Sequence, residues 1–111
     1  MKKIIGKVVK VVIDRPIGSR HPNFRNIVYE VNYGYVDGVL GGDRELQDAY
    51  VLGINIPLVE FIGEVVAIIV RKNDVETKWI VVPNGSKIAD EEIISKIHFQ
   101  EKYFDIKIMR N

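Results

Sequence analysis

Three acidic residues stand close together in a glycine-rich segment of this 111-residue chain. Asp43, Glu45 and Asp48 follow Gly41 and Gly42 in the spacing D-x-E-x-x-D. Hard cations such as Mg²⁺ bind carboxylate oxygens, and a metal-bound water loses its proton far more readily than bulk water. In an extended chain Asp43 and Glu45 face one side and Asp48 the other, so a local turn is needed to bring all three together.

A second acidic segment precedes a lysine further along the chain. Asp74 and Glu76 come shortly before Lys78, at a point where Asn73 and Asp74 indicate a turn. Taken alone, the first acidic segment is more simply explained as a solvated loop, and the second as a hairpin turn with a surface ion pair.

Composition excludes several classes of site. The chain has no cysteine and two histidines, so disulfides, thiol nucleophiles and imidazole-rich zinc or copper sites are not expected. A net charge of +1 gives no basic surface for nucleic acid. No apolar stretch reaches the roughly 18 residues of a membrane span, and Lys7 and Lys10 interrupt the apolar N-terminal run. We therefore expect a cytoplasmic protein without nucleic-acid or membrane partners.

The elements that would position these residues are short strands followed by a helix. Ile- and Val-rich segments predict strands over 3–13, 26–35, 48–52, 64–71 and 78–82, and the segment 89–104 predicts a helix. Loops are expected over 17–25 and 36–45, a connector over 57–63, and a short edge strand or a frayed tail after the helix. Helical spacing places Ile93, Ile97 and Phe104 in the core. The pattern favours a mainly β (α+β) fold: one domain, residues 1–111, forming a small five-stranded OB-like closed barrel with a C-terminal helix packed on it.

Four segments, taken in order, resemble the soluble type-one inorganic pyrophosphatase family. Residues 27–35, IVYEVNYGY, are similar to its tyrosine-proline-x-asparagine-tyrosine-glycine-tyrosine strand. The segment 43–48 follows at the family's spacing and matches the three acidic positions of its aspartate-glycine-aspartate-proline-x-aspartate signature, with a glutamate in the middle. Residues 78–83, KWIVVP, resemble its lysine-apolar-valine-proline strand, and residues 98–103 resemble its C-terminal helix.

The resemblance implies an activity and a set of residue roles. The activity is the hydrolysis of pyrophosphate to two phosphates by a water activated by Mg²⁺, or by Mn²⁺, in a homo-oligomer. Glu45 would be the general base, and Tyr33 would line the pocket beside it. Lys78, Tyr103 and Arg20 would bind phosphate oxygens. The metal ligands would be Asp14, Asp43, Asp48, Asp74 and Glu76.

Two other functions remain open at this point. Phe104 stands where the family usually has a lysine, and the first loop is short, which favours a related phosphohydrolase acting on another phosphoanhydride. The third interpretation is a non-catalytic OB-like binding module. Its support is the barrel pattern together with Tyr29, Tyr33 and Tyr35, which alternate along one strand and share a face.

Overall fold

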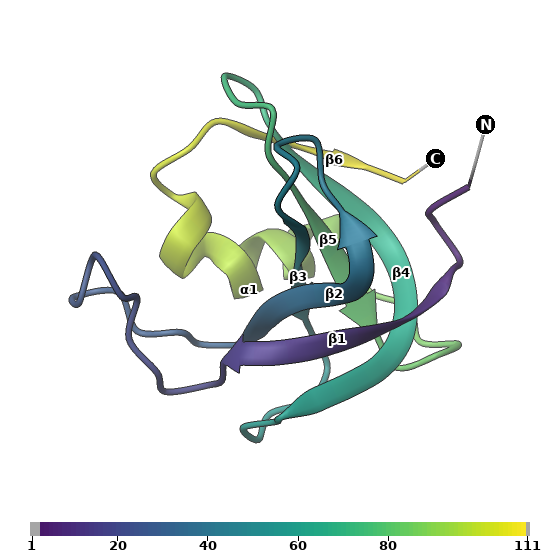
Figure 1. Cartoon of the computed structure of the whole chain (residues 1–111), viewed down its shortest axis with the longest axis horizontal. Coiled ribbons are helices and arrows are strands. Elements are labelled where there is room, and N and C mark those ends of the chain that lie inside the picture. The colour runs from purple at the N-terminus through teal and green to yellow at the C-terminus, as the bar shows by residue number, and fades with distance from the viewer. Residues whose placement is uncertain (1–2, 111) are drawn as a thin grey trace.

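The computed structural model describes residues 3–110, which form a closed barrel with a helix on its outer face (Figure 1). Its strands follow the order β1-β2-β3-β5-β4, and a β1–β4 pairing closes the barrel. β3 and β5 run parallel, the other barrel pairs run antiparallel, and β6 pairs with β4 from outside. The expected fold class is therefore confirmed. The elements are β1 (Val8–Arg15), β2 (Asn32–Leu40), β3 (Leu46–Val51), β4 (Glu60–Arg71), β5 (Thr77–Val82), α1 (Asp90–Glu101) and β6 (Ile106–Met109).

Several element boundaries differ from those expected. The second strand begins at residue 32, not 26, and runs to residue 40, into the segment predicted as a loop. β4 begins at Glu60, inside the predicted connector, because residues 60–64 pair with β1 to close the barrel. The helix ends at Glu101, so Phe104 lies beyond it and is exposed, not in the core. These boundaries depend on long-range pairing, which local sequence patterns do not report. The edge strand after the helix is confirmed as β6.

Side chains on the two faces of the barrel strands form two separate hydrophobic cores. In β3 and β5 the side chains alternate strictly, so Ala49 and Trp79 belong to one core and Tyr50 and Ile80 to the other. The first core receives side chains from all five barrel strands and fills the barrel. The second lies on the outer face, where α1 covers it with Ile93, Ile97 and Phe99. Both faces of these strands are therefore buried, which explains their continuous apolar runs.

A β-bulge in β1 changes the face on which Arg15 lies. Ile13 pairs with Gly34 and Arg15 pairs with Tyr33, so Asp14 is an extra residue in the ladder. Without it, Arg15 would follow Ile13 into the barrel. With it, the Arg15 guanidinium lies 5.5 Å from the centre of the Tyr33 ring, on the outer face. The strands approach so closely at Gly34 that an added Cβ would lie 1.8 Å from the carbonyl oxygen of Val12.

Buried Asn32 ties the β1–β2 loop to the β3–β4 loop at the start of β2. Its Oδ1 accepts the backbone N–H groups of Ile17 and Leu58, and its Nδ2 donates to the carbonyl oxygen of Ile56. This fixes the base of the loop between β1 and β2, which projects on the same side of the barrel as α1 (Figure 1). Within residues 3–110, no helix is long and apolar enough to cross a membrane.

Candidate functional site

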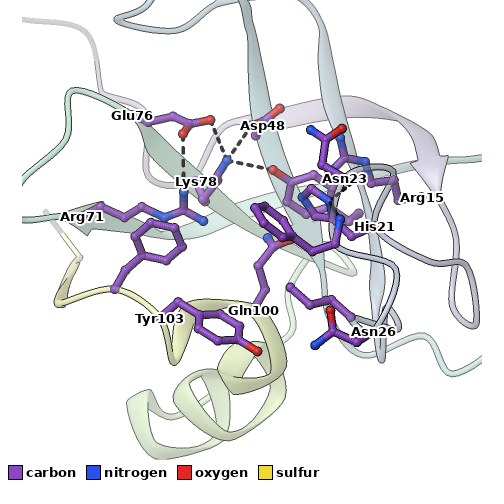
Figure 2. Close-up of a pocket in the computed structure, with 14 residues that line it drawn as sticks. Arg15, His21, Asn23, Asn26, Asp48, Arg71, Glu76, Lys78, Gln100 and Tyr103 are labelled. Atoms are coloured by element: carbon purple, nitrogen blue, oxygen red, sulfur yellow. Dashed lines mark hydrogen bonds and ion pairs between the residues drawn. The ribbon is translucent and has the colours of Figure 1, made fainter.

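A cavity of about 540 Å³ lies between the outer face of the barrel, the β1–β2 loop and the C-terminal end of α1. Figure 2 shows charged side chains of β3, β4 and β5 on one side of it, and Tyr103 and Asn26 on the opposite side. Among the described residues, three cationic side chains and two carboxylates line it: Arg15, Arg71, Lys78, Asp48 and Glu76.

Lys78 occupies the centre of the charged side. Its Nζ donates to the Tyr33 hydroxyl at 2.8 Å, to Asp48 Oδ2 at 2.6 Å and to Glu76 Oε1 at 2.8 Å. An ammonium group has three N–H donors, so all of them are used. Burial alone raises the pKa of the Asp48 carboxyl, but the Lys78 charge and hydrogen bonds outweigh burial and hold that pKa below its usual range.

The Tyr33 hydroxyl remains protonated in this setting. Burial, and then the negative charge of Asp48, raise the pKa of Tyr33 far above its usual value. The phenol therefore serves as a neutral hydrogen-bonding group beside Lys78. It does not act as a base at neutral pH.

Arg71 forms the floor of the cavity and belongs to a buried network. Its Nη2 and Nε donate to the two oxygens of Glu101 at 2.7 and 2.9 Å, and its Nη1 donates to Glu76 at 3.4 Å. Tyr50 donates to Glu101 as well. The Phe104 ring covers the guanidinium, with its centre 3.7 Å from Cζ. Burial on its own lowers the pKa of Arg71, but the hydrogen bonds to Glu101 raise it overall.

A further part of the cavity wall is built around Arg15, which lies beside Tyr33 as Lys78 does. Its Nη1 donates to the Tyr29 hydroxyl at 2.7 Å, and Tyr29 donates to Gln100 Oε1 at 2.6 Å. This is the only hydrogen bond that the Arg15 side chain makes within residues 3–110, so most of its five N–H donors remain open to a ligand.

His21 holds the β1–β2 loop closed over the cavity. Its Nδ1 accepts the backbone N–H groups of Asn23 at 3.1 Å and of Phe24 at 3.2 Å, so the ring must be neutral at that nitrogen. Burial, followed by the positive charges of Arg15 and Lys78, lowers the pKa of His21.

The predicted site residues fall into two groups. Tyr33, Asp48, Glu76, Lys78 and Tyr103 all line the cavity. The other predicted residues lie outside it. Asp43 shares a small neighbouring cleft with Asp48 and Glu76, whereas the remaining residues are exposed: Asp14, Arg20, Glu45 and Asp74.

A turn does form around the acidic segment, but it does not gather all three carboxylates. Asp43 Oδ1 accepts the backbone N–H of Glu45 at 3.0 Å, and Arg44 adopts a left-handed conformation with a φ of 67°. Glu45 is exposed on this turn and does not line the cavity, whereas Asp48 lines it from β3.

The carboxylates do not fit a pair of divalent cations in this arrangement. Asp48 and Glu76 are already bound to Lys78, and Glu76 is bound to Arg71 as well. Within residues 3–110, no three His, Asp or Glu side chains lie close enough to hold a metal ion. The metal-binding roles assigned by resemblance therefore stay predictions.

Sequence patterns missed Arg15 and Arg71 as site residues. Arg71 had a signal, because period-two alternation in β4 places it on the buried face with Ala67 and Ile69. A charged residue at a buried position requires a partner, and here the partner is Glu101. Arg15 had no such signal, since a bulge placed it on the cavity side.

Solved structures of bacterial inorganic pyrophosphatases share this fold. The enzyme from Ehrlichia chaffeensis matches with a TM-score of 0.71 and 17% identity over 97% of this chain and 88% of that one. That from Coxiella burnetii matches with a TM-score of 0.65 and 18% identity over 98% and 86% of the two chains. That from Thermus thermophilus matches with a TM-score of 0.62 and 20% identity over 99% and 87%. No family model and no curated protein matches the sequence. The likeness establishes an inorganic-pyrophosphatase-like fold.

Proposed function

We propose that the protein hydrolyses a phosphoanhydride bond at the cavity beside Lys78, with inorganic pyrophosphate as the expected substrate. The observation that carries this proposal is the arrangement of Lys78 between Asp48 and Glu76 on the outer face of a pyrophosphatase-like barrel. It joins cationic groups, which phosphate oxygens need, to carboxylates, which can orient a water molecule.

The side chains of the cavity suggest a division of labour. Arg15 has unused N–H donors and would contact a phosphoryl group first. Lys78 has none, so it would exchange one carboxylate for a phosphate oxygen as the substrate enters. The carboxylate that it releases would become available to accept a proton from water. Asp48, which is half-buried and faces the cavity, is the residue to which we assign this role.

Several expectations that follow from the resemblance remain predictions. The Mg²⁺ or Mn²⁺ requirement is one, and we derive no step through a metal ion, because the carboxylates are engaged with Lys78 and Arg71. The resemblance implies Glu45 as the general base, an alternative to our assignment of that role to Asp48 that the Glu45→Gln variant tests. Homo-oligomeric assembly and a cytoplasmic location are others.

The first experiment measures phosphate release from pyrophosphate by the pure protein. The assay is run with Mg²⁺, with Mn²⁺ and with a chelator, beside the variant Asp48→Asn. Asp48→Asn keeps the shape of the side chain but removes its charge, so we expect release to fall by at least about 100-fold while the circular dichroism spectrum is unchanged. Glu60→Gln, at an exposed ion pair with Lys10, is the matched control and should keep full activity.

Comparison of the assays with Mg²⁺, with Mn²⁺ and with chelator shows whether phosphate release needs a divalent cation. Release that needs Mg²⁺ would show that turnover requires a divalent cation, either held by the protein or carried in with the pyrophosphate. Release that persists in chelator would assign charge stabilisation to Arg15 and Lys78 alone. No release under any condition would contradict the proposal for pyrophosphate, and full activity in Asp48→Asn would contradict the role of Asp48.

A further inference from the structure

The two ends of the cavity differ in chemistry. Arg15 and Lys78 bring positive charge to one part, whereas Figure 2 shows Tyr103 and Asn26 on the side away from Lys78. A cavity of about 540 Å³ falls within the range of roughly 300–1,000 Å³ that is usual for drug-sized ligands. A bare pyrophosphate ion is far smaller than such ligands and would leave the uncharged side empty.

Two exposed aromatic rings line the cavity. Phe24 is 59% exposed and Tyr103 is 56% exposed, although both line the cavity. The Phe24 ring contacts the His21 ring at a tilt, with 5.1 Å between their centres, and Lys102 Nζ lies 5.3 Å from the centre of the Tyr103 ring. Both rings therefore keep surface open to a ligand. Aromatic side chains of this kind stack on nucleobases, whatever the base.

Two side-chain amides also line the cavity. Asn23 and Asn26 line the cavity, are exposed, and make no side-chain hydrogen bond to any residue that the structure describes. An amide offers both a donor and an acceptor, which suits the polar edge of a base. Neither amide would be needed to bind a ligand made only of phosphate.

Few cationic N–H donors in the cavity are free to bind an anion, which favours a ligand that is only partly anionic. All three Lys78 donors are used, and Arg71 is held by Glu101 and Glu76 beneath the Phe104 ring. Among the described cationic side chains that line the cavity, Arg15 thus has the most open donors. One guanidinium suits the phosphoryl end of a longer ligand better than it suits a dense anion that needs charge on every side.

We infer that the cavity binds a nucleoside phosphate, with its phosphoryl groups at Arg15 and Lys78 and its base on Phe24 and Tyr103, near Asn23 and Asn26. This inference rests on the proposed phosphoanhydride function and names the class of substrate for it. The scissile bond would then be a phosphoanhydride of a nucleoside di- or triphosphate.

Two ligands that resist hydrolysis test the inference without turnover. α,β-Methylene-ADP and methylenediphosphonate carry the same diphosphate-like group, and only the first carries a nucleoside. Calorimetric titration of each into the full-length protein, with and without Mg²⁺, compares their affinities. We expect the nucleotide analogue to bind at least about tenfold more tightly, because base stacking adds to the phosphate contacts.

Variants at the aromatic end make the test specific. This inference places Tyr103 at the base, not at the phosphate oxygens as the resemblance implies. Phe24→Ala and Tyr103→Ala should therefore each weaken the nucleotide analogue by about tenfold and leave methylenediphosphonate unchanged, whereas Tyr103→Phe should retain the wild-type affinity. Both rings are exposed, so their removal should not unfold the chain. Val75→Ala is the matched control, because Val75 is exposed and lies outside the cavity lining.

The outcomes separate this inference from the proposed hydrolysis. Equal affinity for the two ligands, no binding of the nucleotide analogue, or an equal effect of Tyr103→Ala on both ligands would overturn it. Selective binding of the nucleotide analogue without any phosphate release would support it and count against hydrolysis. Hydrolysis of pyrophosphate without selectivity for the nucleotide analogue would support the proposed hydrolysis and overturn the nucleotide inference.

Discussion

The Lys78 ammonium lies 2.6 Å from Asp48 Oδ2, and the two residues are direct partners in the parallel register of β3 and β5. The backbone ladder therefore places this ion pair, so it does not depend on the conformation of a loop. Glu76 joins the pair from just before β5, 2.8 Å from the same ammonium group. The cavity thus contains a preformed charge cluster on two rigid strands.

Loss of Lys78 should destabilise the protein. Lys78→Met removes the ammonium group that binds both Asp48 and Glu76, so Asp48 loses this counter-charge while Glu76 keeps Arg71. Since Lys78 is buried but its partners are partly exposed, we expect a loss of about 2 kcal/mol in the free energy of unfolding. Urea denaturation measures it. Lys10→Met, at an exposed pair, should cost less than about 0.5 kcal/mol, and an equal cost in both variants would contradict the importance of the cluster.

Acid should weaken the same cluster through Asp48. Its pKa in the folded protein lies below the unfolded value of about 3.9, so the Asp48 carboxylate stabilises the fold above that pH. This contribution is lost as the pH falls through the lowered pKa. The stability difference between wild type and Asp48→Asn should therefore shrink between about pH 5 and pH 2. A difference that does not change with pH in denaturation curves would disprove the assignment.

The Arg71–Glu101 pair should be the costliest charged interaction to break. Both side chains are almost fully buried, and Glu101 also accepts a hydrogen bond from Tyr50. Glu101→Gln keeps the size of the side chain but leaves the guanidinium without its counter-ion, so we expect a loss of about 3 kcal/mol in thermal or urea unfolding. Asp105→Asn, at the exposed pair with Lys72, is the control. A loss below about 1 kcal/mol in Glu101→Gln would show that the pair contributes little.

Protonation of His21 should open the loop that it closes. The pKa of His21 in the folded state is lowered, so the unfolded chain binds more protons as the pH falls below the usual value of about 6.5, and stability falls with it. Amide exchange at Asn23 and Phe24, which donate to the ring, should accelerate over the same range. His21→Gln should remove this dependence. Exchange rates that follow only the intrinsic pH trend would contradict the role of His21.

The position of Glu45 gives a direct comparison with Asp48. Glu45 is exposed on the β2–β3 turn and lies outside the cavity lining, so Glu45→Gln should change phosphate release by less than about threefold, much less than Asp48→Asn. Steady-state rates with pyrophosphate measure both variants. If Glu45→Gln instead lost activity as fully as Asp48→Asn, the turn would have to close during turnover and bring Glu45 into the cavity.

Local sequence patterns were enough to determine the fold class, and a family resemblance indicated part of the site. Runs of β-branched residues marked the barrel strands, and the acidic residues before Ile93 and Ile97 marked the helix, because these preferences depend on near neighbours along the chain. The family resemblance, and not local patterns, grouped Asp48, Glu76 and Tyr103 with Lys78; all four line the cavity, and their roles stay predictions.

Only the tertiary structure decided which charges meet. The bulge at Asp14 moved Arg15 to the cavity, the parallel register of β3 and β5 joined Asp48 to Lys78, and the packing of α1 brought Glu101 to Arg71. Each event depends on strand pairing or helix packing between residues far apart in the chain. A sequence pattern places a residue on a face, but the partner across that face is fixed only when the barrel closes.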